Sequence, residues 1–224
     1  MITLELTEYC IKLNKMYKII FSLLLFFSIE AMSASQNKSD FSLCMDSIDN
    51  VLLSVPQCKD SSKIMSMIWL CEKLQKRDIS SEQSFILSIK EGQLYGMLGK
   101  YAEGFLIQEN GVLRLDSNDI RRLEFYALKY KYTGDIVISN MFFNKAIEEC
   151  DKMMDNKYIP MLKFTILLAK GDYIGAKDWL VFRSRKFKDK QARDALNDID
   201  VYIQQSKESD LFMKKVFNDF IKGQ

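Results

Sequence analysis

The chain has 224 residues, of which 48% are hydrophobic and 28% are charged, as is normal for a soluble folded protein. Its 32 basic and 30 acidic residues give a net charge of +2, which provides no general attraction to nucleic acid or to an anionic membrane. The sequence contains no histidine, which excludes a Ser-His-Asp triad, a Cys-His pair and an H-E-x-x-H zinc site.

Residues 1–34 have the pattern of a secretory leader. The segment 12–18 is basic, the run 19–27 is entirely apolar apart from one serine, and small residues are frequent in 28–35. This order is typical of a signal peptide, and the apolar run is shorter than the roughly 20 residues that span a bilayer. The pattern predicts export to the periplasm or out of the cell.

Two details of the leader stay open at this point. Met16 is an alternative start of translation, and cleavage is expected near residues 33–35. The mature form would then be one helical-repeat domain, residues 35–224, without a stable membrane span. The alternative is a membrane-anchored protein that keeps residues 17–29 as its anchor.

The chain after the leader is expected to be helical. Apolar residues recur at helical spacing over residues 41–52, until Pro56 interrupts the stripe. Asp60 and Ser80 are typical helix-starting residues, and the helix after Ser80 is expected to end near Leu98. Because no segment has a clear strand pattern and glycine and proline are few, the sequence predicts an all-α fold.

Three glycines recur at a nearly fixed interval. Gly99, Gly134 and Gly171 are 35 and 37 residues apart, and each lies between two helical segments. Glycine at a helix C-terminus can adopt the left-handed conformation that ends the helix. A period of this length is typical of stacked helical hairpins.

Small and aromatic residues surround these glycines in a recurring order. The matching positions are Gly92 and Tyr95 in the first copy, Ala127 and Tyr130 in the second, and Gly171, Tyr173 and Ala176 in the third. The segment 139–149 also carries Phe142, Phe143 and Ala146. These residues resemble the tetratricopeptide repeat, and the glycine-rich stretches 98–104 and 109–112 resemble the related Sel-like repeat.

The resemblance covers residues 82–188 and implies a right-handed solenoid of antiparallel helical hairpins. The amphipathic segment 211–221 is expected to be a C-terminal capping helix that covers the last repeat. The first copy departs from the family, because Gly104, Gln108 and Gly111 stand where alanine, an aromatic residue and alanine are expected. In the third copy Arg183 replaces the last alanine.

The family's spacing implies that the first helix of each hairpin lines a concave groove. The implied residues are Ile86, Ile89, Gln93 and Met97; Arg121, Glu124, Leu128, Lys131 and Tyr132; and Tyr158, Met161, Thr165 and Leu168. Mostly apolar grooves of this kind bind peptides or helices. We therefore expect a scaffold that binds a protein or peptide partner, with no catalysis, metal or cofactor. The alternative is that the chain covers its own groove with the segment 211–221.

Two charged clusters suggest other possible functions. Glu148, Glu149, Asp151 and Asp155 could serve an enzyme or a small-ligand-binding domain, or could form a solvated helix end. The basic run 183–193 could bind phosphates, lipid headgroups or an acidic partner, or could end the last repeat in solvent.

Cys44 and Cys71 are candidates for a disulfide. If segments 41–53 and 60–76 form an antiparallel hairpin about a turn near Pro56, the two cysteines lie level on the facing apolar stripes. Export would permit the bond, which would stabilise the fold by roughly 3 kcal/mol. The alternative is that all the cysteines are buried small hydrophobic residues.

Overall fold

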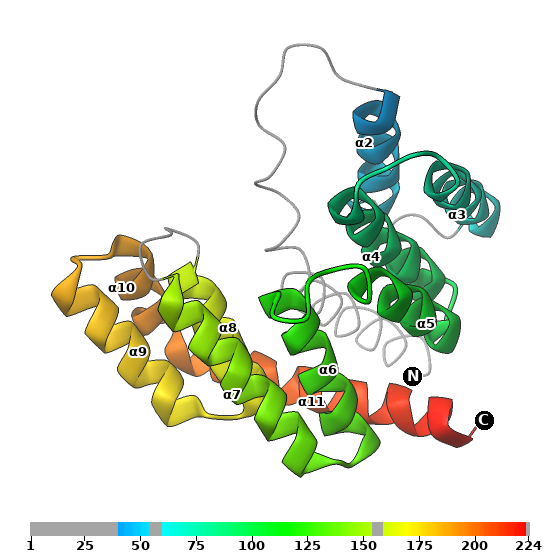
Figure 1. Ribbon diagram of the computed structural model, residues 1–224. Helices are drawn as coiled ribbons and strands as arrows, with labels where there is room; N and C mark the ends of the chain where they lie inside the picture. Colours follow the sequence, from blue (N-terminus) through cyan, green and yellow to red (C-terminus); the bar gives the residue numbers. More distant parts are fainter. Residues whose placement is uncertain (1–39, 54–59, 154–158, 223–224) are drawn as a thin grey trace, which may run out of the picture. The chain divides into compact units, whose positions relative to one another are not determined.

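The structure is a computed structural model that describes residues 40–53, 60–153 and 159–222. These residues are almost entirely helical and contain no strand, which confirms the all-α prediction (Figure 1). They form two compact units, residues 40–116 and residues 117–222. The predicted leader, residues 1–34, lies outside the described residues.

The first unit contains four helices among residues 40–53 and 60–116. Their bounds are α2 (Asp40–Leu53), α3 (Ser61–Gln75), α4 (Ser81–Met97) and α5 (Tyr101–Val112). Helices α3 and α4 begin where the sequence predicts. The Asp60 carboxylate accepts the backbone N–H of Ser62 at 2.9 Å, and Ser80 and Gln83 form a reciprocal capping box.

Helix α4 is the central helix of this unit. All residues from Ser84 to Leu94 are buried, and α4 packs against α2, α3 and α5. Three of the expected groove residues, Ile86, Ile89 and Gln93, are in this buried stretch. Their side chains are therefore enclosed in the structure and are not open to a partner.

Glycines allow α4 and α5 to approach closely. A Cβ atom on Gly104 would lie 2.5 Å from the carbonyl oxygen of Gly92, and one on Gly111 would lie 2.5 Å from the Cβ of Ser88. Real Cβ atoms do not approach other atoms this closely. The departures from the repeat pattern at Gly104 and Gly111 are thus requirements of backbone packing in this hairpin.

Polar side chains are buried beside this contact. The amide of Gln75 on α3 donates to the Ser88 hydroxyl at 3.0 Å and to the Glu91 carboxyl at 3.4 Å. Burial, and then the nearby Glu72, raise the pKa of Glu91 to about 7. Lys90, also buried, is paired with Asp49 on α2. These bonds join three helices through groups that need partners once they leave water.

The predicted disulfide is not formed in this structure. Cys44 on α2 and Cys71 on α3 are both free thiols, although the two helices pack against each other as expected. Cys71 is fully buried, and burial raises the pKa of its thiol. Cys44 is half-buried. Cys71 is therefore a small core residue in this structure, whereas the half-buried Cys44 does not match the alternative in which all the cysteines are buried.

The second unit contains six helices among residues 117–153 and 159–222. Their bounds are α6 (Ile120–Thr133), α7 (Ile136–Lys152), α8 (Ile159–Lys170), α9 (Tyr173–Lys186), α10 (Lys190–Asn197) and α11 (Ile199–Lys222). Successive helices from α6 to α10 pack as neighbours, and α11 returns to contact α6 and α8 (Figure 1). The long final helix thus connects the beginning of the unit to its middle.

The recurring glycines adopt the predicted left-handed conformation. Gly99, Gly134 and Gly171 have φ angles of 76°, 98° and 88°. In the second unit each glycine is followed by an aspartate, Asp135 or Asp172, whose side chain caps the next helix. The repeated Gly-Asp pair is therefore a helix end joined directly to a helix start.

Gly134→Ala is expected to lower the free energy of unfolding by about 1 kcal/mol, because alanine is strained at positive φ. No neighbouring atom would obstruct the new Cβ, so the loss measures backbone strain alone. Urea unfolding followed by circular dichroism would measure it. Gly134→Asn should recover much of the loss, since asparagine tolerates this conformation. Equal losses for the two variants would contradict the explanation.

Two hydrophobic clusters form the core among the described residues of the second unit. The first includes Leu123, Ala127, Phe143, Ala146 and Ile166, and the second includes Phe164, Leu168, Ala176, Leu180 and Ala195. Small residues at the predicted repeat positions 127, 146 and 176 are fully buried, so the helices can pack closely there.

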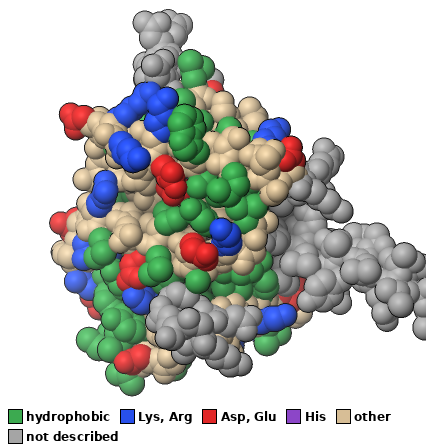
Figure 2. Space-filling model, turned by 90° about the vertical axis from the view of Figure 1, so that its right-hand side faces the viewer, with side chains coloured by type: hydrophobic (Ala, Val, Ile, Leu, Met, Phe, Trp, Pro, Cys, Tyr) green, Lys and Arg blue, Asp and Glu red, His purple; other side chains and the backbone are tan. Residues whose placement is uncertain are grey.

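Figure 2 shows acidic and basic side chains scattered among hydrophobic ones over the face in view.

Candidate functional site

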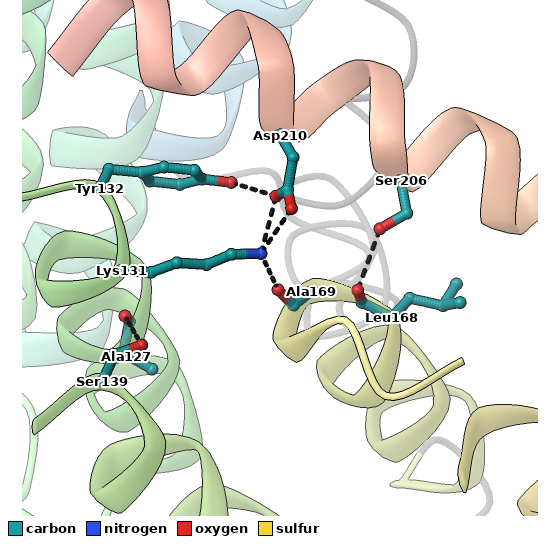
Figure 3. A network of polar contacts seen from close by, with 8 residues as sticks. All are labelled: Ala127, Lys131, Tyr132, Ser139, Leu168, Ala169, Ser206 and Asp210. Atoms are coloured by element: carbon teal, nitrogen blue, oxygen red, sulfur yellow. Dashed lines mark hydrogen bonds and ion pairs between the residues drawn. The ribbon is translucent and has the colours of Figure 1, made fainter. Parts of the chain in front are cut away.

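Helix α11 lies across α6 and α8, and a small set of polar contacts holds it there (Figure 3). Ser206, Asp210 and Phe217 are four and seven residues apart along α11, so they share one face of the helix. The contacts of these three residues with α6 and α8 define the candidate site.

Asp210 is the centre of the site. Its two carboxylate oxygens accept from the Lys131 ammonium at 2.8 and 2.7 Å, and one of them also accepts the Tyr132 hydroxyl at 2.7 Å. Lys131 donates in addition to the carbonyl oxygen of Ala169 at the end of α8. We call the contacts of Asp210 with Lys131 and Tyr132 the clasp.

Two further contacts extend the clasp along α11. The Ser206 hydroxyl donates to the carbonyl oxygen of Leu168 at 3.0 Å. The centres of the Phe217 and Tyr132 rings are 5.4 Å apart. Tyr132 is only 8% exposed, and its burial together with the Asp210 carboxylate raises the pKa of its hydroxyl. The tyrosine therefore stays a neutral donor to Asp210 at physiological pH.

Lys131→Met is expected to lower the free energy of unfolding of the second unit by about 2 kcal/mol. The lysine and aspartate side chains are 12% and 20% exposed, so removal of one leaves the other poorly solvated. Hydrogen exchange of the α6 and α11 amides would measure the loss. Lys177→Met, at an exposed position on α9, is the matched control. An equal effect of the two substitutions would contradict the assignment.

The other expected groove residues of this unit do not line one common surface, and each makes different contacts. Arg121 is paired with Asp119 at the start of α6, and Leu128 and Met161 pack against the hydrophobic clusters. Glu124 is buried, and burial raises its pKa to about 8. Tyr158 lies outside the described residues. Lys131 and Tyr132 are the two that meet in the clasp.

Of the residues that α11 contributes, Phe217 lies in the predicted segment 211–221, whereas Ser206 and Asp210 were missed from the sequence. The predicted helix began at residue 211, whereas α11 begins at Ile199. Ser206, Ser209 and Asp210 are polar, so a search for an apolar stripe excludes them, yet the two serines are buried. The spacing of Asp210 from Phe217 is the signal that could have found the contact face.

Ser209 shows that the fit of α11 is imperfect. Its hydroxyl oxygen is buried and has no hydrogen-bond partner among the residues that the structure describes. A buried hydroxyl without a partner destabilises the packed state relative to the solvated one. Alanine at this position would therefore remove the unpaired hydroxyl and should stabilise packed α11.

Aromatic rings and cations gather on a second surface, formed by α8, α9 and the turn after α9. Lys163 lies 4.3 Å from the centre of the Trp179 ring, and the Arg183 guanidinium lies 4.2 Å from that of Phe187. Arg183 is buried and is paired with Asp189, so the first residue of the basic run 183–193 belongs to the core.

An open hollow of about 450 Å³ adjoins these rings. Its lining includes Lys163 and Lys170 but also Asp172 and Asp178, so it favours neither sign of charge. The hollow was not predicted from the sequence.

The carboxylates at the end of α7 are arranged as ion pairs. Glu149 is paired with Lys152 at 2.7 Å, and Asp151 is paired with Lys163 at 2.5 Å. Asp155 lies outside the described residues. Within residues 40–53, 60–153 and 159–222, no three acidic or cysteine side chains are grouped as metal ligands would be.

None of the helices described here is both long enough and apolar enough to cross a membrane. Comparison with protein-family models, curated proteins and solved structures finds no match to this chain. The sequence patterns and the contacts of α11 with α6 and α8 are therefore the observations that bear on function.

Proposed function

We propose that this protein is an exported helical-repeat scaffold that binds a protein or peptide partner and catalyses no reaction. The observation that carries the proposal is the α6–α8 face, which holds an amphipathic helix by an ion pair, two hydrogen bonds and an aromatic contact. Apolar faces with a few convergent polar groups are typical helix-binding surfaces. Here the bound helix belongs to the chain itself.

Two sequence features support the remaining parts of the proposal. The basic, apolar and small-residue order of residues 1–34 favours export to the periplasm or out of the cell. The repeated glycine turns, with small buried residues at matching positions, favour a tetratricopeptide-like solenoid. An enzyme that uses the carboxylates of α7 has less support, because Glu149 and Asp151 are each paired with a lysine.

Affinity capture from the native cell envelope, with the full-length protein as bait, tests the proposal. A captured protein must also bind the purified bait in a calorimeter, with saturation at a fixed stoichiometry. Intact-mass measurement of the mature protein should place its N-terminus near residues 33–35. Capture of no partner, together with turnover of a substrate by the purified protein, would overturn the proposed function.

A further inference from the structure

The geometry points to a specific kind of partner for the α6–α8 face. We infer that this face accepts an amphipathic helix of a partner protein that carries a carboxylate two helical turns before an aromatic ring. In the structure α11 occupies the face as an intramolecular competitor. The inference rests on the proposed function and specifies the partner's chemistry.

The carboxylate requirement follows from the groups that the face presents. Lys131 directs its ammonium and Tyr132 its hydroxyl at the same point, where Asp210 now lies (Figure 3). Lys131 is 12% exposed, so an occupant without a carboxylate would leave a poorly solvated ammonium without its counter-ion. Neutral or basic helices are therefore disfavoured.

The aromatic requirement follows from the position of Tyr132. Its hydroxyl donates to Asp210 and its ring contacts Phe217, so this one side chain contacts both the carboxylate and the aromatic ring of the bound helix. A separation of seven residues brings a carboxylate and a ring to the same face of a helix, two turns apart. The same face needs a small residue at the place of Ser206, which is buried and donates to the Leu168 carbonyl.

Two features of α11 suit a competitor that can be displaced. Ser209 leaves a buried hydroxyl without a partner among the described residues, which destabilises packed α11 relative to a solvated helix. Ile199 belongs to the hydrophobic cluster formed with α8, α9 and α10, and Ile203 packs against this cluster. These two contacts would keep the start of α11 attached while the part after Ile203 leaves the face.

Tethering gives α11 an advantage over any helix in solution. A tethered segment acts at an effective concentration in the millimolar range, so it weakens the apparent affinity of an added helix by about 100-fold or more. A partner helix must therefore bind the open face tightly, and a change that releases α11 should expose that affinity.

The experiment uses the full chain and a fluorescent peptide with the sequence of residues 204–222. Asp210→Lys places a second cation beside Lys131 and should release the end of α11 from the face. We expect the peptide to bind this variant at least about tenfold more tightly than it binds the wild type, as measured by fluorescence anisotropy. Glu208→Lys, the same charge change at an exposed residue of α11, is the matched control and should bind like the wild type.

Exchange of the two charges tests whether the ion pair between positions 131 and 210 determines which peptide binds. The chain with Lys131→Glu should bind a peptide that carries Asp210→Lys and should not bind the unchanged peptide, because the two partners of the clasp are then reversed. A peptide that carries Phe217→Ala should lose most of its affinity for the Asp210→Lys chain, since it retains the carboxylate but lacks the ring that contacts Tyr132.

The wild-type chain gives a measurement that does not depend on the folding of a variant. Excess peptide with Ser209→Ala should increase hydrogen exchange in residues 206–218 of the chain and leave α7 and α9 unchanged. No increase, or equal binding of the peptide to the Asp210→Lys and Glu208→Lys chains, would overturn the inference. Capture of a native partner would still support the proposed function in that case. Failure of the inference about the partner helix can therefore be distinguished from failure of the proposed function.

Discussion

Gly104→Ala is expected to lower the free energy of unfolding of the unit 40–116 by about 3 kcal/mol. The added methyl would lie 2.5 Å from the carbonyl oxygen of Gly92, which is a backbone atom of the facing helix. A backbone atom cannot move aside as a side chain can, so α4 and α5 must separate. Hydrogen exchange of the α4 amides, followed by mass spectrometry, would measure the loss for this unit alone.

Gly96→Ala is the matched control in the same helical hairpin. A Cβ atom at Gly96 would make only ordinary contacts, 3.8 Å from the Tyr101 ring. Because alanine favours the helix over glycine, this variant is expected to gain up to about 1 kcal/mol. The two substitutions therefore have opposite predicted signs. A similar gain for Gly104→Ala would show that α4 and α5 do not approach as closely as the structure indicates.

Glu124→Gln is expected to remove about 3 kcal/mol of pH dependence from the stability of the second unit between pH 5 and pH 8. Burial raises the pKa of Glu124 to about 8 in the folded state, whereas the ordinary value is 4.5. In this range the folded protein retains a proton that the unfolded chain has lost. Stability must therefore fall as pH rises from about 5 and must level off above pH 8.

Chemical denaturation at a series of pH values, read through hydrogen exchange of the α6 amides, would test this. At pH 8 the Gln variant should be more stable than the wild type, because glutamine needs no proton to stay neutral. Glu148→Gln, at an exposed position on α7, is the control and should leave the pH profile unchanged. A wild-type profile that is flat from pH 5 to pH 8 would show that Glu124 is charged in the fold.

The local structure of the chain was largely predictable, as the turns illustrate. Gly134 and Gly171 end helices in the left-handed conformation, and Asp60 and Ser80 begin them. These features depend on one residue and its immediate neighbours, so they are readable in a single sequence. The tetratricopeptide-like arrangement of the hairpins remains a proposal, because it concerns how successive elements are oriented.

The candidate site was predictable only in part. Lys131 and Tyr132 were expected to face a partner, and the structure shows them bound to α11 instead. The periodicity of α6 indicates that both residues lie near one face but does not indicate what covers that face. Asp210 is 78 residues from Tyr132 in the sequence, and its charge alone is typical of a solvated helix position.

The sequence by itself determined the helical class, the starts of the helices after Asp60 and Ser80 and the recurring glycine turns, because each follows from backbone preferences and hydrophobic spacing within a few residues. Only the tertiary structure decided that Gly104 faces the Gly92 carbonyl, that Glu124 is buried and that Asp210 joins Lys131 and Tyr132. These outcomes depend on which distant surfaces exclude water from one another. Burial and pairing are therefore properties of the assembled helices, since the same polar side chain is stable in solvent or in the core according to the partner that it meets.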